Sequence, residues 1–261
     1  MIGIFDSGVG GLTVLGALRE RLPAEDFVYL GDTARLPYGT KSATTVQRYA
    51  VNAAAHLQNH GIRLLVVACN TASSYALGEL RERSPVPVIG VVEPGARAAV
   101  ATGAEHIAVI GTEGTVRSDA YQKALARLAP SVKVGAVACP LLVPLAEEGW
   151  GDHPVTDQVA QHYLGPLLDW GVETVILGCT HYPLLRPSLQ RVVGPAVRLV
   201  DSATSVAETV ADVHADLVTG SGAPGSVRLE LTDASDRFLR ITRAILGCDP
   251  EHLEVVDIDQ A

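Results

Sequence analysis

The segment Gly61-Ile-Arg-Leu-Leu-Val-Val-Ala-Cys69-Asn-Thr aligns without a gap with Gly171-Val-Glu-Thr-Val-Ile-Leu-Gly-Cys179-Thr-His, which begins 110 residues later. The same spacing holds beyond the cysteines, where Pro85 falls on Pro195. Buried strands often share apolar residues, but that likeness does not explain why glycine, cysteine and proline coincide at one spacing. The match therefore predicts two related units, each with a buried strand that ends at a cysteine.

A second, weaker match supports the repeat, because Ile2-Gly-Ile-Phe-Asp-Ser7 aligns with Ile107-Ala-Val-Ile-Gly-Thr112 at a spacing of 105 residues. Short runs rich in Val and Ile alternate with longer stretches in which apolar residues recur at the spacing of an α-helix. We expect strands at Ile2–Phe5, Phe27–Leu30, Leu64–Ala68, Val86–Val92, Ile107–Ile110, Val132–Ala138, Thr174–Leu177 and Val197–Val200. We expect helices at Leu12–Arg21, Ala43–Gln58, Arg117–Leu128 and Asp157–Trp170. Such alternation predicts an α/β fold with two pseudo-symmetric parallel-sheet domains.

Composition narrows the class of protein. The 261 residues are enough for two domains, since a domain usually has about 100–150 residues. Lys and Arg number 20 against 29 Asp and Glu, so the basic surplus typical of nucleic-acid binding is missing. The longest stretch without a charged residue, 64–78, has 15 residues, and a membrane helix needs about 20. The N-terminal residues show no secretory signal, and we expect a cytoplasmic protein.

Four cysteines are present, and none forms a C-x-x-C pair, which disfavours a redox motif or a zinc ribbon. Free thiols are expected. Cys139 and Cys248 are interpreted as ordinary core residues. Cys69 and Cys179 differ, because small polar residues follow each of them where a strand should turn into a helix.

Open α/β sheets bind ligands beyond the carboxyl ends of their strands, so two facing units would place Cys69 and Cys179 on opposite sides of one cleft. A thiolate on one side could remove a proton from a carbon, and a thiol on the other side could return one to the opposite face. This reaction inverts a stereocentre, and it requires each sulfur to lie about 3–3.5 Å from the carbon.

Other strand ends leave alternatives open. Asp6 and Ser7, before the glycines of 8–11, form either a ligand loop or a capped turn. The hydroxyls of Thr112 and Thr115 could bind an anion or cap a helix. His181 could tune Cys179 or only bond within its loop.

Five blocks resemble the signature segments of the glutamate racemase family, in order and with fitting spacing. They are Asp6-Ser-Gly-Val-Gly-Gly-Leu-Thr13, Gly31-Asp-Thr-Ala-Arg-Leu-Pro-Tyr-Gly39, Ala68-Cys-Asn-Thr-Ala72, Val143-Pro-Leu-Ala-Glu147 and Gly178-Cys-Thr-His-Tyr-Pro183. The resemblance extends to about Asp201, and the C-terminal sixty or so residues carry no matching motif. It implies a racemase without cofactor or metal that interconverts L- and D-glutamate, with D-glutamate used for bacterial peptidoglycan, the cell wall and cell shape.

The resemblance also implies the role of each site residue. Cys69 and Cys179 would be the acid/base pair, each serving one enantiomer. Asp6 and His181 would assist the neighbouring thiols, with Glu147 beside His181; Glu148 follows directly, so this match rests on the Val-Pro-Leu spacing. The residues expected to bind the substrate are Asp6, Ser7, Tyr38, Gly39, Asn70, Thr71, Thr180 and His181.

Domain boundaries follow by analogy with the family, in which the C-terminal segment returns to the first domain. We expect residues 1–93 plus 206–261 in the first domain and 94–205 in the second. The expected partner is the small-molecule substrate, with no nucleic acid and no membrane. A homodimer is the expected assembly, although the family varies in oligomeric state.

Three alternatives remain at this point. An aspartate racemase would have the same paired cysteines. A dinucleotide-binding protein would use the glycines at 8–11 with Asp32 as the ribose ligand, but the G-x-G-x-x-G pattern needs glycine at Thr13. An amino-acid binding module would hold glutamate without exchanging its α-proton.

Overall fold

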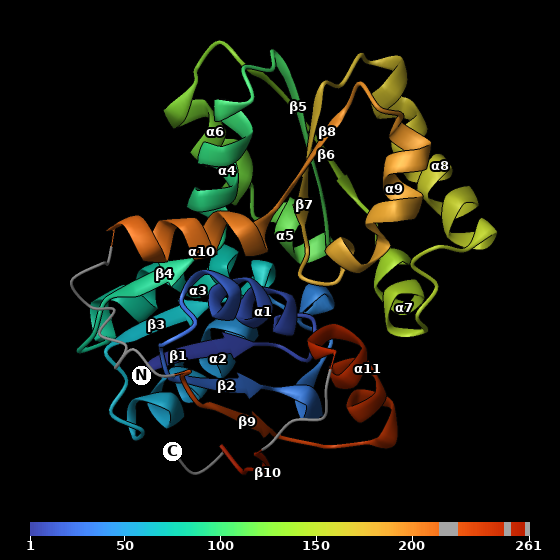
Figure 1. Ribbon diagram of the computed structural model, residues 1–261. Helices are drawn as coiled ribbons and strands as arrows, with labels where there is room; N and C mark the ends of the chain where they lie inside the picture. Colours follow the sequence, from blue (N-terminus) through green and yellow to red (C-terminus); the bar gives the residue numbers. More distant parts are fainter. Residues whose placement is uncertain (214–223, 248–251, 259–261) are drawn as a thin grey trace.

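Two parallel sheets form the protein, whose computed structural model describes residues 1–213, 224–247 and 252–258 (Figure 1). The first sheet has six strands in the order β10-β9-β2-β1-β3-β4, and the second has four in the order β6-β5-β7-β8. The first sheet contains β1 (Ile2–Asp6), β2 (Phe27–Gly31), β3 (Leu64–Val67), β4 (Val88–Gly90), β9 (Val227–Leu231) and β10 (Leu253–Val255). The second contains β5 (His106–Gly111), β6 (Lys133–Ala138), β7 (Thr174–Gly178) and β8 (Arg198–Asp201). The predicted fold class is confirmed.

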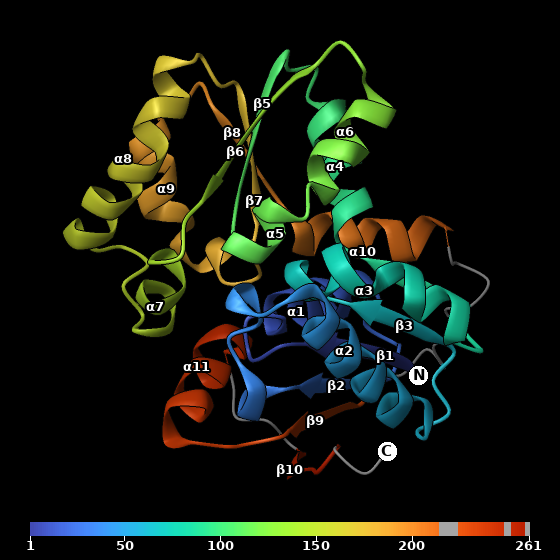
Figure 2. The same ribbon diagram turned by 180° about the vertical axis from the view of Figure 1, so that it is seen from behind.

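Helices cover both faces of each sheet (Figures 1 and 2). Their bounds are α1 Leu12–Arg21, α2 Ala43–Gln58, α3 Asn70–Arg83, α4 Val92–Ala101, α5 Glu113–Arg117, α6 Ala120–Leu128, α7 Leu142–Glu147, α8 Pro154–Asp169, α9 Arg186–Val193, α10 Ser202–Val213 and α11 Asp236–Leu246. Short 3₁₀ turns lie at Thr33–Arg35, Tyr38–Thr40 and Tyr182–Leu185. No helix within the described ranges is long and apolar enough to cross a membrane.

The internal repeat is visible in the strand register. Ile2 pairs with Leu64 in the first sheet, and Ile107 pairs with Thr174 in the second. These pairs are related by the same spacings of 105 and 110 residues that align the sequences. The order β2-β1-β3-β4 therefore recurs as β6-β5-β7-β8, and β3 and β7 end at corresponding places beside Cys69 and Cys179.

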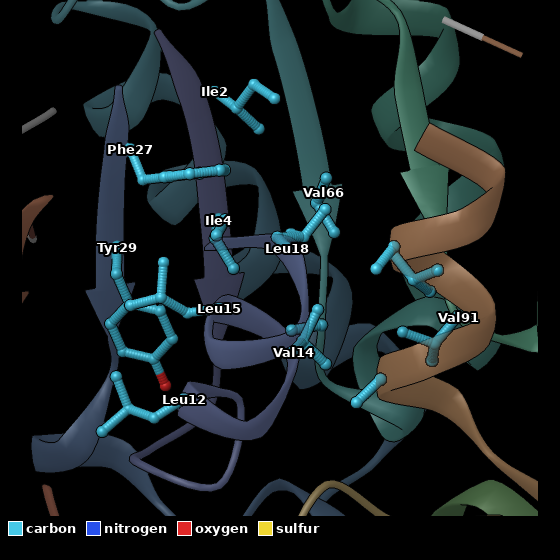
Figure 3. Close-up of a cluster of buried hydrophobic side chains, with 14 of the residues drawn as sticks. Ile2, Ile4, Leu12, Val14, Leu15, Leu18, Phe27, Tyr29, Val66 and Val91 are labelled. Atoms are coloured by element: carbon cyan, nitrogen blue, oxygen red, sulfur yellow. The ribbon is translucent and has the colours of Figure 1, made fainter. Parts of the chain in front are cut away.

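The alternation of side chains divides the first domain's core into two layers. Ile2 and Ile4 of β1 face a cluster built with α1, α10 and α11, which Figure 3 shows in close-up. Phe5 points to the other face, where α2 and α3 pack. The second sheet has α7, α8 and α9 on one face and α4 and α6 on the other. Because both faces of each sheet are buried, the strands have nearly continuous apolar sequences rather than alternating ones.

Three predicted elements differ in the structure. The strand expected over Val86–Val92 is only Val88–Gly90, since proline at 85 and 87 has no N–H to donate and α4 begins at Val92. The single helix expected over Arg117–Leu128 is wrong, because Asp119 adopts φ 56° and separates α5 from α6. Asp tolerates this left-handed conformation better than most residues do. Helix α8 begins earlier than expected, at Pro154, because proline suits the first helical position.

The C-terminal segment, which carries no recognised motif, supplies β9, β10 and α11 to the first domain. Helix α10 packs against α1 and lies at the junction of the two domains in both views (Figures 1 and 2). The expected boundaries near residues 93 and 206 stay a prediction.

Burial in the first core predicts a large stability effect. Leu15 is fully buried on α1, so Leu15→Ala should lower the free energy of unfolding by about 2–5 kcal/mol, through lost burial and a residual cavity. Leu141→Ala is the control, since Leu141 is 56% exposed and should change stability little. Urea unfolding of both variants tests this, and an equal loss in the two would contradict the assignment of the core.

Candidate active site

A cavity of about 240 Å³ lies between the two domains, at the carboxyl ends of β1, β3, β5 and β7. It is lined by Ser7, Gly8, Leu36, Pro37, Tyr38, Gly39, Thr40, Cys69, Asn70, Thr71, Thr112, Glu113, Pro140, Val143, Pro144, Glu147, Cys179, Thr180 and His181. Both predicted thiols line this one cavity. Its volume is below the roughly 300–1,000 Å³ of pockets for drug-sized ligands, which favours a substrate of amino-acid size.

Cys69 is the N-cap of α3 and is 5% exposed. Its Sγ accepts the Ala72 N–H at 3.4 Å and lies 3.3 Å from Ser7 Oγ. Burial and the nearby Asp6 carboxylate raise the pKa of the Cys69 thiol to about 12, although Ser7 and the Ala72 N–H act to lower it. Cys69 therefore holds its proton at neutral pH in this arrangement.

Cys179 has a different neighbour. Its Sγ lies 3.8 Å from Nδ1 of His181, whose Nε2 is 3.2 Å from a carboxylate oxygen of Glu147. Burial acts to lower the pKa of His181, but Cys179 and Glu147 together raise it to about 10. Glu147, and not the exposed Glu148, is the acid beside His181.

Asp6 lies beneath the cavity and is not among its lining residues. Its carboxylate is fully buried, accepts the Gly8 N–H at 3.0 Å through Oδ2, and has no hydrogen bond at Oδ1. Burial raises the pKa of Asp6, while His181 and backbone N–H groups oppose the rise. Asp6 adjoins the cavity through its own loop and its effect on Cys69, and the expected contact of Asp6 with substrate stays a prediction.

Polar groups from both domains surround the thiols. Thr71 Oγ1 lies 2.9 Å from Thr112 Oγ1 and 3.3 Å from Thr115 Oγ1, which links α3 to the N-cap of α5. Asn70 Oδ1 accepts a hydrogen bond from Tyr121 at 2.7 Å, whereas its buried Nδ2 has no partner. This unpaired donor at the N-terminus of α3 is suited to an anionic group of a ligand.

Tyr38 reaches the cavity because Asp32 and the C-terminal segment hold it. Its hydroxyl donates to Asp32 Oδ2, and Thr232 donates to Asp32 Oδ1 at 3.0 Å. Burial, followed by the Asp32 carboxylate, raises the pKa of Tyr38, so the phenol stays neutral. Asp32 is thus bonded through both oxygens, which disfavours the dinucleotide alternative that needs it for a ribose.

Two glycines permit the close approach of the domains. A Cβ on Gly10 would lie 2.5 Å from Thr180 Oγ1 and 2.6 Å from the His181 ring. A Cβ on Gly39 would lie 2.6 Å from the Cβ of Thr112. Any side chain at either position would push the two walls of the cavity apart.

Sequence reasoning missed several lining residues, although the repeat contained a signal for one of them. Thr112 is the repeat counterpart of Ser7. Of the two alternatives for its hydroxyl, the structure shows the cap of α5, and Thr112 also lines the cavity. Thr40, Glu113 and Pro140 had no comparable signal, whereas Val143 and Pro144 lie in one of the five blocks that resemble the family. Cys139 is buried in the second core, as predicted, and Cys248 lies outside the described residues.

A larger hollow of about 460 Å³ lies between α7 and α11, which are neighbours in both views (Figures 1 and 2). It shares Glu147 with the cavity but contains neither thiol. The smaller cavity is therefore the better candidate for chemistry.

Comparison with known proteins agrees with this geometry. Residues 8–210 match the family model Asp/Glu/Hydantoin racemase. The chain is 51% identical over 249 residues to the glutamate racemase of Geobacter metallireducens, covering 94% of this chain and 92% of that one. The crystal structure of Francisella tularensis glutamate racemase in complex with D-glutamate matches with a TM-score of 0.93 at 32% identity, covering 100% and 98% of the two chains. Escherichia coli glutamate racemase, in complex with L-glutamate and an activator, gives 0.79 at 30% identity, covering 98% and 97%.

The chain therefore belongs to the Asp/Glu/Hydantoin racemase family. The relatives named above are glutamate racemases and align over nearly the full chain, so this protein is an amino-acid racemase, an isomerase.

The contact of His181 with Glu147 predicts a titration effect. Glu147→Gln should lower the pKa of His181 from about 10, because the mutation removes one of the two groups that raise it. Since this pKa lies above the ordinary 6.5, protonation of His181 stabilises the fold fully below about pH 6.5, and the contribution is lost as pH rises through about 10. NMR titration of the imidazole nitrogens measures the shift.

Glu148→Gln is the matched control, because Glu148 is adjacent in sequence but exposed. An unchanged His181 pKa in the Glu147 variant would contradict the contact.

Proposed function

We propose that the protein interconverts L- and D-glutamate by a two-base mechanism, with Cys69 and Cys179 as the opposed acid and base. The observation that carries the proposal is that two buried thiols, at corresponding strand ends of a repeat, line one small cavity. Relatives named glutamate racemase, and structures of such relatives holding D- or L-glutamate, support glutamate as the substrate.

In one direction a Cys69 thiolate takes the α-proton, so the C–H bond breaks and an S–H bond forms. The electron pair stays on the substrate as an enolate-like carbanion. The Cys179 thiol then gives its proton to the opposite face of that carbon and becomes a thiolate. In the reverse direction the two cysteines exchange roles, so each enantiomer is deprotonated by a different cysteine.

The surroundings of the thiols fit this exchange. A protonated His181, held by Glu147, places a positive charge beside Cys179 when that sulfur is anionic. Buried Asp6 disfavours a second negative charge at Cys69. We assign Asp6 as a positioning residue and His181 with Glu147 as the groups that assist Cys179.

Substrate binding is assigned to the lining residues Ser7, Tyr38, Gly39, Asn70, Thr71, Thr180 and His181. The N-terminus of α3 and the free Asn70 Nδ2 are suited to a carboxylate. Preorganised donors in a closed, dry cavity are the means by which an enzyme stabilises a developing carbanion.

We further propose a cytoplasmic enzyme that supplies D-glutamate to peptidoglycan and works as a homodimer. Size-exclusion chromatography with light scattering tests the assembly.

The two-thiol mechanism predicts that Cys69→Ser and Cys179→Ser each lower racemisation by at least about 100-fold, since a serine hydroxyl is a poor base at neutral pH. Proton NMR of L-glutamate in D₂O, with circular dichroism to detect D-glutamate, measures exchange and inversion together. Cys139→Ser is the matched control, because that thiol is buried outside the cavity.

Near-full activity in either cavity variant would exclude the mechanism. Exchange of aspartate but not glutamate would reassign the substrate, and exchange of neither would leave an amino-acid binding module.

The position of His181 predicts an asymmetric defect in His181→Asn. The two enantiomers have equal free energy in water, so kcat/KM must fall equally in both directions. Because His181 contacts only one of the two thiols, kcat itself should fall more for the enantiomer that uses Cys179 as base, with KM changing to compensate. Initial rates from each pure enantiomer measure this split, and equal changes in kcat would indicate general positioning instead.

A further inference from the structure

Three side chains that could bind a metal ion meet away from the cavity. His56 lies in the last turn of α2, His60 follows in the next turn, and Glu230 lies on β9. His56 Nε2 is 2.7 Å from one carboxylate oxygen of Glu230, and His60 Nε2 is 3.1 Å from the other. The three ligand atoms lie within 4.8 Å of one another, and this is the one such group in the described part of the chain.

Local structure explains why they meet. His60 lies two residues beyond the end of α2, in a turn that continues the helical path, because Asn59 keeps helical dihedral angles and the His60 N–H bonds to the Leu57 carbonyl oxygen at 3.1 Å. The side chains of His56 and His60 therefore lie on the same side of this segment. Gly61, at φ +67°, ends the turn directly after His60. On β9, Leu229 and Leu231 point into the core beneath α1 and α11, so Glu230 points to the opposite face, where α2 packs. The contact of Glu230 with the two histidines therefore depends on the pairing of β9 with β2 in the sheet.

The burial of the group is suited to a bound ion. Glu230 is 1% exposed, and an ionised carboxylate is costly to bury without a cation or donors. The side chains of His56 and His60 keep 17% and 21% exposure, which leaves a route from solvent and room for a water ligand. Neither histidine lines the candidate active site.

We propose that His56, His60 and Glu230 bind one Zn²⁺ ion, with water as the fourth ligand. Two imidazoles and a carboxylate form a common zinc ligand set, with metal–ligand distances of about 2.0–2.2 Å. Ligand atoms of a tetrahedral site at these distances lie roughly 3.3–3.5 Å apart. The 2.7 and 3.1 Å separations, which run to different oxygens of Glu230, would widen by less than about 1 Å. Any separation near the 4.8 Å limit of the group would close by about 1.5 Å, a change within reach of side-chain rotation. Each histidine would then carry its proton on Nδ1, and the ion would replace the Nε2 hydrogen bonds.

Such an ion would fasten the C-terminal segment to the first domain. His56 and Glu230 are 174 residues apart in sequence, and the ion would join α2 to β9 directly. Zinc that binds only the folded state shifts the unfolding equilibrium by about 100-fold at a free concentration 100 times its Kd. The site would therefore be structural and independent of the proposed racemisation.

The test uses the full chain, stripped of metal, in a Cys69→Ala/Cys179→Ala background, because the thiols and His181 in the cavity could also bind zinc. Competition between the protein and a chromogenic chelator gives the stoichiometry and affinity for Zn²⁺, and Co²⁺ substitution gives a d–d spectrum. We expect one equivalent of zinc, four-coordinate Co²⁺ bands and a higher midpoint of thermal unfolding with zinc.

His60→Gln and Glu230→Gln should each weaken binding at least about 100-fold, since even loss of a second-shell partner costs about 10–100-fold. His60 is partly exposed, so its variant remains informative if the Glu230 variant fails to fold. His162→Gln is the control, because His162 is an exposed histidine on α8.

Failure to bind an equivalent of zinc, or binding unaffected by His60→Gln, would overturn the proposal. Either result would leave a hydrogen-bonded His–Glu–His cluster. Because the background lacks both thiols, this outcome is separate from that of the racemase assays.

Discussion

The close contact between the loop after β1 and the loop after β7 is the constraint on which the candidate active site depends. Thr13 donates a hydrogen bond to the Thr180 carbonyl oxygen at 3.1 Å, across the two domains. Gly10 leaves no space for a side chain between the loops. This contact brings Cys69 and Cys179 to one cavity, and without it each thiol would be an ordinary residue at the end of a strand.

The repeat makes the site nearly symmetric, but its charges are not symmetric. Asp6 corresponds to Gly111 in the second unit, and His181 corresponds to Thr71 in the first. One thiol therefore has an acid nearby and the other has a histidine with its own acid. In the two-base mechanism proposed above, these unequal surroundings are what distinguish the two thiols, because neighbouring charges act differently on each sulfur.

The C-terminal segment shows how residues without a motif contribute to a site. Thr232 bonds to Asp32, which in turn holds the Tyr38 hydroxyl at the cavity. Glu230, two residues earlier, meets His56 and His60 beside α2, on the same face of the sheet. Both contacts exist because β9 adds to the edge of β2, a pairing that places residues about 200 positions apart side by side.

The sequence by itself determined the α/β class, the repeat, most strand positions and the two thiols. These features rest on local patterns, namely apolar runs, turn residues and spacing, which act over a few residues. Only the tertiary structure decided that Asp6 lies outside the lining of the cavity and that the helix expected at Arg117 is broken at Asp119. The position of Glu147 beside His181 was already implied by the resemblance, and the structure adds the 3.2 Å contact. It alone also joined His56 and His60 to Glu230. Such contacts depend on which strands pair and on how the helices pack over them. Strand pairing and helix packing join residues far apart in the chain, so local sequence patterns do not reveal them.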